Sequence, residues 1–551
     1  MLERLLEGWL DSASERSYQG PFCQVLSAKG YKILHSTRHC ALEYGKDIIA
    51  IGPDGMPCAF QLKGNPGARL SLTGFREIQS QLVQLVSQPI IYPGLRISEH
   101  RSFLVTNGLV EEEVHRALDD LNRGWAEQGA IGYPVELISR GQLLADVQEY
   151  GASLWPSELE DVNKLLNLLV KDGKEHYPFD LASEVLKDVL LLEDDVAIKV
   201  SSNEIGRRIT SAALLATITL RNFYRERNYY SIICGWCMYA AHVIACIERH
   251  VKSYNKNAKA AIEIAMASIY AALSDLCDEI KERRHLVEGD PLTDAVSYRG
   301  RYTLIIALMS CYWFWGNESG FLKDGQDAFL TKFIPRDFVH HYLWGEGAVP
   351  QILVYIWYLR ATEAGIRPDL LLGALLRQII GANTQKNNNG LSSPYYGFED
   401  EIRHLMREFL GVKEDPYQDT KFQNSSYFAK PLLYLLVRTN LKQTAKSIWP
   451  SYSKMLHKHF VPDSKWMYCL YRSVKGKNVD DQPLLTKEWR ELQQEARECR
   501  CPEVPAPLAD NKFLLLLFSI IFPFRAIPSV VSKLDRYFNG SWFIHEPPIE
   551  R

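Results

Sequence analysis

The spacing of apolar residues changes near Trp155-Pro156, and this change limits the fold class open to each part of the chain. Up to about residue 150, short apolar runs of strand length alternate with segments of helical period. Beyond it, segments of helical period follow one another and strand signals thin out. The sequence therefore predicts an α/β domain, with a mixed central sheet flanked by helices, followed by a large all-α helical array.

A polar stretch from Gly381 to Gly397 interrupts the helical part. It contains Asn387-Asn388-Asn389-Gly390 and Ser392-Ser393-Pro394, which favour turns. We therefore predict three domains, at residues 1–150, 151–380 and 381–551. The 551 residues are enough for two to four domains. The helices predicted beyond residue 155 are Leu159–Val170, Leu181–Leu192, Ile209–Arg225, Tyr230–His250, Ala258–Arg284, Tyr302–Trp315, Val349–Ala364, Asp369–Ile380, Asp400–Leu410, Tyr427–Asn440, Thr444–His459, Thr486–Cys499 and Asn511–Ile521.

The main candidate site residues of the N-terminal part lie in a predicted hairpin. The apolar run Ile48–Ile51 is followed by the turn Gly52-Pro53-Asp54-Gly55 and a second apolar run that carries Gln61, Leu62 and Lys63. Gly, Pro and Asp supply the backbone angles that tight turns need. Asp47 precedes the first run, so the hairpin brings it to the same end as Gln61 and Lys63.

These residue types suit the hydrolysis of a phosphodiester. Asp47 is the expected principal ligand of a divalent cation, which prefers hard oxygen ligands. Lys63 would place a positive charge beside the phosphoryl group in the transition state. Gln61 offers a neutral carbonyl oxygen to the metal. The pattern therefore predicts a metal-dependent phosphodiesterase with Asp47, Gln61 and Lys63 at its centre.

The strand, turn and Gln-x-Lys pattern resembles the Mrr-like restriction endonuclease branch of the PD-(D/E)xK nuclease superfamily, in which Gln replaces the second carboxylate. The resemblance implies a restriction-endonuclease-like fold, Mg²⁺ or Mn²⁺ as the cofactor, and the backbone carbonyl of Leu62 as a further metal ligand. A helical Glu supports the site in many members, and Glu15 is the candidate here, with Gln19 second. The substrate implied is nucleic acid, with DNA preferred, and the implied role is restriction or anti-phage defence.

The element order on both sides of the hairpin extends this resemblance from about residue 10 to residue 150, roughly a quarter of the chain. Upstream, we predict a short helix ended by Gly30 and a strand at Lys32–His35. The segments predicted downstream are a helix at Leu72–Val86, a strand at Ser102–Thr106, a helix at Glu111–Leu121, a strand at Pro134–Ser139 and a helix at Gly141–Val147.

Net charge gives no general attraction to nucleic acid. The formal charge is -3 and the pI is near 6.6, so any contact must come from a local basic face. One candidate face combines Lys454, Lys458, Lys465 and Arg472 with the aromatic residues between them. Such a mixture would line a phosphate backbone and stack on bases. The alternative is a solvated helix face whose aromatic side chains point inward.

The N-terminal sequence and the cysteine pattern favour a cytoplasmic protein without a membrane anchor. Charges at Glu3, Arg4 and Glu7 interrupt the region where a signal peptide would need apolar residues. The cysteines are scattered, which fits a reducing compartment. Two apolar segments, Tyr229–Ile247 and Phe513–Phe522, are predicted to be buried helices rather than membrane spans.

Three functions follow as alternatives. The first is a metal-dependent endonuclease with a helical region that senses or regulates, and that region is also the expected site of a protein partner or of self-association. The second is a non-catalytic nucleic-acid-binding or scaffold protein with an inactive nuclease fold. The third is a helical partner-binding protein with an α/β appendage and no affinity for DNA.

Overall fold

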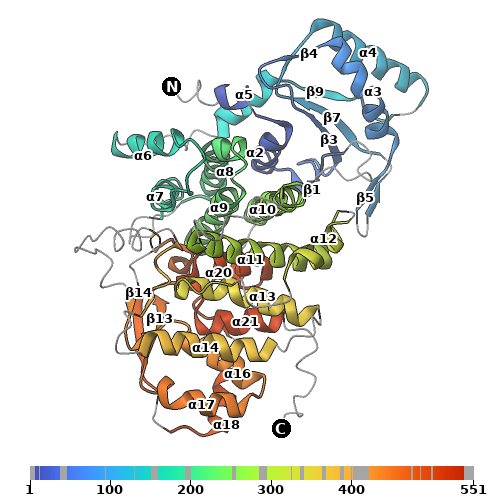
Figure 1. Cartoon of the computed structure of the whole chain (residues 1–551). Coiled ribbons are helices and arrows are strands. Elements are labelled where there is room, and N and C mark those ends of the chain that lie inside the picture. Colours follow the sequence, from blue (N-terminus) through green and yellow to red (C-terminus); the bar gives the residue numbers. More distant parts are fainter. Residues whose placement is uncertain are drawn as a thin grey trace. The chain divides into compact units, whose positions relative to one another are not determined.

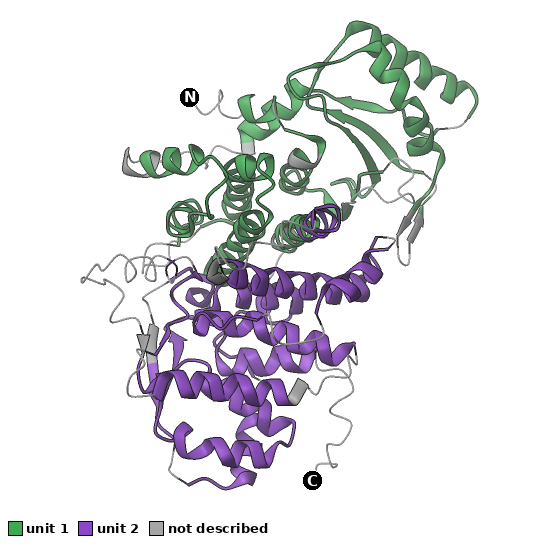
Figure 2. Ribbon diagram, viewed as in Figure 1, with its two compact units in different colours: residues 1–272 green, residues 273–551 purple. Residues whose placement is uncertain are grey.

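A computed structural model of the chain provides the fold. It describes residues 7–538 except for 12, 37–45, 93–94, 98, 130, 151–158, 193–199, 251–255, 284–294, 324, 336–340, 363–367, 385–389, 399, 401, 403–420, 473–475, 484–485 and 498–499. Two compact units are present, unit 1 at residues 1–272 and unit 2 at residues 273–551 (Figure 2). The boundary between them falls within helix α10 (Lys256–Glu282). The predicted domain limits at residues 150 and 380 stay predictions.

A five-stranded mixed sheet organises the N-terminal part of unit 1 (Figure 1). The strand order is β1-β2-β3-β7-β9. The pairs β1/β2 and β2/β3 are antiparallel, whereas β3/β7 and β7/β9 are parallel. The predicted α/β class with a mixed sheet is thereby confirmed. The bounds are β1 Lys32–Ser36, β2 Ile48–Ile51, β3 Pro57–Lys63, β7 Arg101–Thr106 and β9 Glu136–Ile138.

Helices cover both faces of this sheet. On one face, Ile49, Ala59 and Leu104 pack in one core with Phe75 of α3 (Leu72–Ser87) and Leu118 of α4 (Glu112–Glu127). The alternating residues of the strands point to the opposite face. There the Phe60 ring stacks on Phe103 at 4.6 Å and meets Phe22 of α2 (Glu15–Ala28) at 5.8 Å. Figure 1 shows α3 and α4 together on one side of the strands.

Helix α2 is longer than the sequence predicts. We expected a short helix near Phe22, but α2 begins at Glu15 and continues through Pro21 to Ala28. The extra turns place Tyr18 in the core, where it is 1% exposed. The other elements expected here are present, the last of them α5 (Arg140–Tyr150), and we refer to residues 7–150 of unit 1 as the sheet domain. Two-stranded pairs join β4 (Arg69–Leu70) with β8 (Leu109–Val110) and β5 (Ile90–Tyr92) with β6 (Leu95–Ile97).

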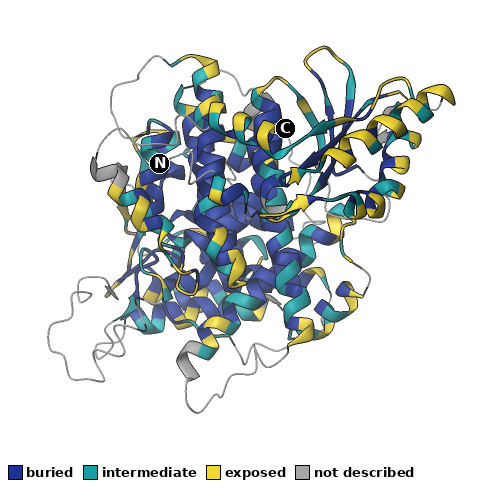
Figure 3. Cartoon of the chain, turned by 90° about the horizontal axis from the view of Figure 1, so that it is seen from above, coloured by how far each residue is buried: buried dark blue, intermediate teal, exposed yellow. Residues whose placement is uncertain are grey.

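The rest of unit 1 is helical, as predicted. Helix α8 (Ser202–Arg225) packs against both α9 (Tyr229–His250) and α2, and every residue of α9 from Ser231 to Ile247 is buried. Figure 3 shows buried residues along the helices and exposed residues on outer helix faces. Two helical segments, Tyr229–His250 and Lys259–Glu282, are long and apolar enough to span a membrane, with 94% and 67% of their most apolar windows buried. The helix bounds are α6 Leu159–Leu169, α7 Phe179–Val189, α8 Ser202–Arg225, α9 Tyr229–His250 and α10 Lys256–Glu282.

Unit 2 is mostly helical but also contains small sheets. The predicted helix Thr444–His459 is wrong in its second half, because α17 ends at Tyr452 and the chain then forms strand β13. Strand β13 (Leu456–Pro462) pairs antiparallel with β14 (Gly476–Asp481) and parallel with β12 (Ser425–Ser426). These partners are distant in sequence, so a local period does not reveal the pairing. The predicted helix Asp400–Leu410 lies largely outside the described residues.

The elements of unit 2 have the following bounds: α11 Ala295–Ser319, α12 Gln326–Phe333, η3 Glu346–Ala348, α13 Val349–Ala361, α14 Pro368–Thr384, β10 Leu391–Ser392, β11 Lys421–Phe422, β12 Ser425–Ser426, α16 Ala429–Arg438, α17 Lys442–Tyr452, β13 Leu456–Pro462, η5 Lys465–Cys469, β14 Gly476–Asp481, α18 Trp489–Arg497, α19 Ala506–Ala509, α20 Lys512–Ile521, η6 Pro523–Arg525 and α21 Pro528–Phe538.

Candidate functional site

The hairpin of β2 and β3 brings the predicted site residues together at one end of the sheet. Gly55 adopts a positive φ of 84° in the turn, and Ile51 pairs with Pro57. Because the strands are antiparallel, the start of β2 lies beside the end of β3. The Asp47 carboxylate oxygen Oδ2 accepts hydrogen bonds from Gln61 Nε2 and from the Leu62 backbone N–H, each at 2.6 Å.

Gln61 supplies a buried oxygen that accepts no hydrogen bond from the described residues. The residue is 4% exposed, and its Oε1 has no partner among the described residues. Its Nε2 lies 3.3 Å from the Leu62 carbonyl oxygen as well as contacting Asp47. An unpaired buried acceptor costs free energy, so an arrangement that leaves one suits the binding of a cation.

The donor set fits a hard divalent cation. Asp47, the Gln61 amide oxygen and the Leu62 carbonyl offer oxygen ligands of the kind that Mg²⁺ and Mn²⁺ prefer. Only one of the three is charged. In the part of the chain that the structure describes, no group of three or more His, Cys, Asp or Glu side chains is placed to hold a metal. A cation here would therefore depend on neutral oxygens.

Glu15 and Lys63 form the rim of this site. The Lys63 Nζ and the Glu15 Oε2 lie 4.0 Å apart, and the two side chains are 20% and 22% exposed. Glu15 occupies the first turn of α2. One turn later, Gln19 donates from Nε2 to the Asp47 backbone oxygen at 3.2 Å. Both helical residues predicted from the sequence thus lie at the site: Glu15 lies beside the Lys63 side chain, and Gln19 binds the Asp47 backbone.

Burial dominates the electrostatics. Burial raises the pKa of Asp47 to about 6, and the nearby Glu15 carboxylate acts in the same direction. The hydrogen bond from the Leu62 N–H and the charge of Lys63 act in the opposite direction and lower the pKa. Burial also lowers the pKa of the neighbouring Lys46 to about 8. Lys46 Nζ donates to the Gln84 carbonyl of α3 at 3.4 Å. A nearby cation would favour the charged form of Asp47.

Tyr18 belongs to this site, although the sequence did not identify it. Its hydroxyl accepts from the Lys63 backbone N–H at 3.1 Å and lies 3.0 Å and 3.3 Å from the carbonyl oxygens of Lys63 and Val105. Gly64 allows the close approach, since a Cβ there would lie 2.8 Å from the Glu15 backbone nitrogen. The available signals were an aromatic residue one helical turn after Glu15 and a glycine directly after Lys63.

Asn107 was also missed, and it holds the segment that leads into α2. Its side-chain Nδ2 donates to the carbonyl oxygens of Leu10 and Ala13, both at 2.8 Å. Its Oδ1 accepts from the Asn65 backbone N–H at 2.8 Å. A single buried amide therefore ties the start of α2 to the chain just after Lys63. The only sequence signal was a polar Thr-Asn-Gly run after an apolar strand.

The residues predicted to bind nucleic acid lie on several elements of unit 2. Lys454 and Lys465 are exposed, Lys458 Nζ lies 3.7 Å from an Asp480 carboxylate oxygen, and Arg472 donates to the Tyr395 carbonyl at 2.6 Å. The intervening Phe460 and Tyr468 are 3% and 0% exposed. Those two rings cannot stack on bases in this conformation. Binding of nucleic acid by the four basic residues stays a prediction.

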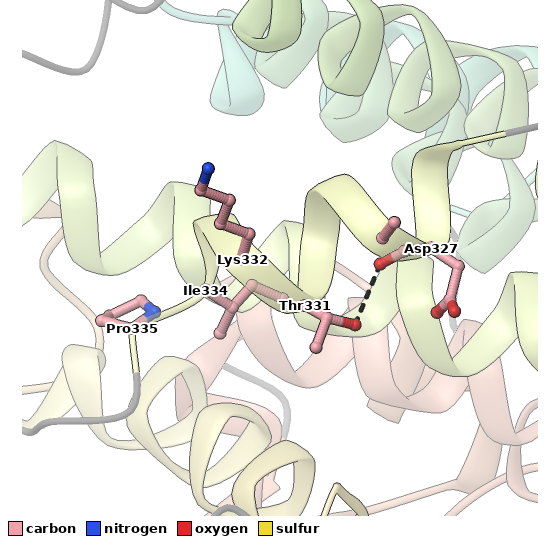
Figure 4. Close-up of a pocket in the computed structure, with 6 residues that line it drawn as sticks. Asp327, Thr331, Lys332, Ile334 and Pro335 are labelled. Atoms are coloured by element: carbon pink, nitrogen blue, oxygen red, sulfur yellow. Dashed lines mark hydrogen bonds between the residues drawn. The ribbon is translucent and has the colours of Figure 1, made fainter.

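A surface hollow of about 600 Å³ lies along α12 and contains none of these residues (Figure 4). Thr331 Oγ1 donates to the Asp327 backbone oxygen at 2.9 Å within it, and Figure 4 shows Lys332 extending away from Asp327. The hollow offers no cluster of catalytic side chains. Its lining residues are Asp327, Ala328, Thr331, Lys332, Ile334 and Pro335.

Comparison with known proteins leaves the site to be judged by its own geometry. No family model, no curated protein and no solved structure matches this chain.

Proposed function

We propose that the sheet domain is a metal-dependent endonuclease that hydrolyses phosphodiester bonds of nucleic acid, with DNA as the preferred substrate. One observation carries the proposal. Asp47, the Gln61 side chain and the Leu62 carbonyl meet at one strand end, where the Gln61 Oε1 has no partner among the described residues, and Lys63 lies at the adjacent rim. This combination of oxygen ligands beside a positive charge suits phosphodiester hydrolysis.

The proposed metal ligands are Asp47, Gln61 and Leu62. A bound Mg²⁺ or Mn²⁺ would polarise the phosphoryl oxygen and increase the acidity of a bound water. The residues around it have separate tasks. Leu62 N–H fixes the Asp47 carboxylate, Gln19 holds the Asp47 backbone, and burial limits the water that reaches both.

Lys63 and Glu15 act at the rim. The partly exposed Lys63 ammonium can approach a phosphate and would stabilise the negative charge that grows in the transition state. Glu15 holds that ammonium from the other side and is close enough to affect Asp47 electrostatically. Tyr18 holds the Lys63 backbone at both its N–H and its carbonyl.

A non-catalytic nucleic-acid-binding protein is the second candidate. The observation that favours it is the hydrogen bond from Gln61 Nε2 to Asp47 Oδ2, which turns the donor side of the amide toward the carboxylate. In an active site the Gln61 oxygen would have to face the cation instead. In both cases we propose that the helical remainder senses or restrains, within restriction or anti-phage defence.

A cleavage assay separates the two candidates. The full chain is incubated with supercoiled plasmid DNA in Mg²⁺, in Mn²⁺ or with a chelator, beside the Asp47→Ala variant. The endonuclease predicts nicked or linear product only for the wild type with metal. Asp47→Ala should remain folded, because the apolar interior of β2 is untouched. DNA binding without product in either metal would support the binder, and full turnover by Asp47→Ala would remove Asp47 from the site.

A further inference from the structure

Among the arginines of the sheet domain whose side chains the structure describes, two lack the carboxylate partner that the other four have. Four arginines there form ion pairs: Arg101 with Glu136, Arg116 with Glu112, Arg123 with Asp120 and Arg140 with Asp11. Arg69 and Arg76 are exposed, and no carboxylate of the described residues lies within ion-pair distance of either. Their guanidinium groups are thus available to an external anion.

Both arginines follow Lys63 along a continuous path. In the sheet, β3 and β7 run parallel and end with Lys63 paired to Thr106. The same two chain segments pair again, still parallel, as β4 and β8, where Arg69 pairs with Leu109. Strand β4 therefore continues past the strand end that carries the proposed catalytic residues. Figure 1 shows β4 beside α3 and α4 in the sheet domain.

The link between Lys63 and Arg69 is fixed rather than loose. The Asn65 backbone N–H donates to Asn107 Oδ1 at 2.8 Å, and the Asn65 side-chain Nδ2 donates to Thr106 Oγ1 at 3.1 Å. Gly108 packs against the same residue so closely that a Cβ would lie 2.7 Å from the Asn65 Cβ. The separation of Arg69 from the proposed site is therefore set by the fold.

Core residues orient both arginine side chains outward. Leu70 and Phe75, 3% and 0% exposed, belong to one core, and each is adjacent in sequence to one of the arginines. The start of α3 is held by Ser71, whose Oγ accepts from the Gly74 N–H at 3.3 Å. Charged groups held on such rigid elements are arranged before a ligand arrives.

We infer that Arg69 and Arg76 bind backbone phosphates of a polymeric nucleic acid that extends from the cleavage site along β4 to the start of α3. The inference rests on the proposed function and adds to it the surface that holds the nucleic-acid strand beyond the cleavage site. Guanidinium groups bind phosphates through paired N–H donors. Because neither arginine has a described ion pair, binding such a phosphate breaks none of the described ion pairs.

Binding measured against salt tests this directly. Duplex DNA of about 30 base pairs is titrated with wild type and with the double variant Arg69→Ala/Arg76→Ala, in a chelator, between about 50 and 200 mM salt. Each lost phosphate contact should lower the slope of log affinity against log salt by about 0.9, so the double variant should lose roughly 2. Arg116→Ala, an exposed arginine paired with Glu112, is the matched control and should keep the slope.

The outcomes separate this inference from the proposed function. An unchanged slope in the double variant, or an equal loss in Arg116→Ala, overturns the inference, as does a wild type that does not bind DNA. If the salt slope depends on both arginines but DNA is never cleaved, the proposed binding surface is supported and the proposed endonuclease activity is contradicted. If the wild type cleaves DNA, the double variant should lose far more of its DNA cleavage at limiting substrate than of its hydrolysis of bis(p-nitrophenyl) phosphate. Equal losses on both substrates would place the arginines' effect at the cleavage site and overturn the inference.

Discussion

The sheet domain and unit 2 both bury carboxylates, but they surround them differently. In unit 2, Glu346 is completely buried and accepts hydrogen bonds from four groups at 2.6 to 3.0 Å. The donors are Asn383 Nδ2, Ser426 Oγ and the backbone N–H groups of Tyr427 and Phe428. These bonds join η3 to α14 and to the chain that enters α16. Glu346 is therefore a structural cross-link.

Asp47 has a different environment. It too accepts two short hydrogen bonds, but the neighbouring Gln61 keeps an unpaired oxygen, and the partly exposed Lys63 and Glu15 lie close by. The contrast teaches that burial alone does not identify a site. A buried carboxylate is a candidate ligand where another oxygen remains unpaired beside a rim that solvent and substrate can reach.

The largest expected effect on stability tests the structural role of Glu346. Glu346→Ala removes the acceptor shared by four donors, and buried donors left unpaired cost about 1–3 kcal/mol each, so we expect a loss of about 4 kcal/mol. Asp47→Ala should cost less, because it leaves fewer of the described donors unpaired, Gln61 Nε2 and the Leu62 N–H, and relieves a buried charge. Urea denaturation followed by circular dichroism measures both. Equal losses would break the contrast between the two carboxylates.

The next effect concerns Lys63 and distinguishes catalysis from binding. The ammonium should interact more strongly with the transition state than with bound substrate, so Lys63→Ala should lower the cleavage rate about a hundredfold, equivalent to about 3 kcal/mol. Affinity for DNA should fall far less. Single-turnover cleavage and equilibrium binding are measured on the same duplex at fixed salt. A similar, modest decrease in both would make Lys63 a phosphate anchor and favour the non-catalytic binder.

A smaller effect sharpens the role of Gln61. If its carbonyl oxygen ligates the metal, Gln61→Glu should retain or strengthen Mn²⁺ binding, because the added charge attracts the cation. Gln61→Ala should weaken Mn²⁺ binding by about tenfold. Isothermal titration with Mn²⁺ gives both affinities, with Gln24→Ala as a buried glutamine control on α2. Indistinguishable affinities across wild type and both Gln61 variants would place Gln61 outside the metal shell.

The last effect is a pH dependence of stability, which is small over any single pH unit. Burial raises the pKa of Glu346 from about 4.5 to about 7, so between these values the folded state binds a proton that the unfolded state releases. The free energy of unfolding contributed by Glu346 should therefore fall as pH rises from about 4.5 to about 7, and then level off. One group contributes at most about 1.4 kcal/mol per pH unit.

The variant Glu346→Gln isolates the contribution of Glu346 titration to the free energy of unfolding, since the amide does not titrate in that range. The difference in the free energy of unfolding between wild type and variant should decrease through the window and become constant above it. The Asp47→Asn difference should level off earlier, because burial raises the pKa of Asp47 only to about 6. Two parallel curves would show that the environments of these carboxylates do not differ as the structure indicates.

Much of the sheet domain follows from local sequence. The hairpin of β2 and β3, strand β7 and helices α3 and α4 all lie where periodicity and turn residues predict them. The meeting of Asp47 with Gln61 and Lys63 follows from the same hairpin, because one turn and one register determine it. Several helices of unit 2 were similarly visible, but α12 and α21 were not predicted, and β13 replaces the end of a predicted helix.

The sequence by itself determined the period of each segment and the end of the hairpin at which polar side chains gather, because both depend on neighbours a few residues apart. Tertiary structure alone decided which distant groups support them. Tyr18 reaches Lys63 across 45 positions, and Asn107 reaches Leu10 across 97. Such contacts depend on how α2 packs against the strand ends, and no local period encodes that packing. The same holds for Arg69 and Arg76, whose lack of a described ion pair appears only once the positions of the described carboxylates are known.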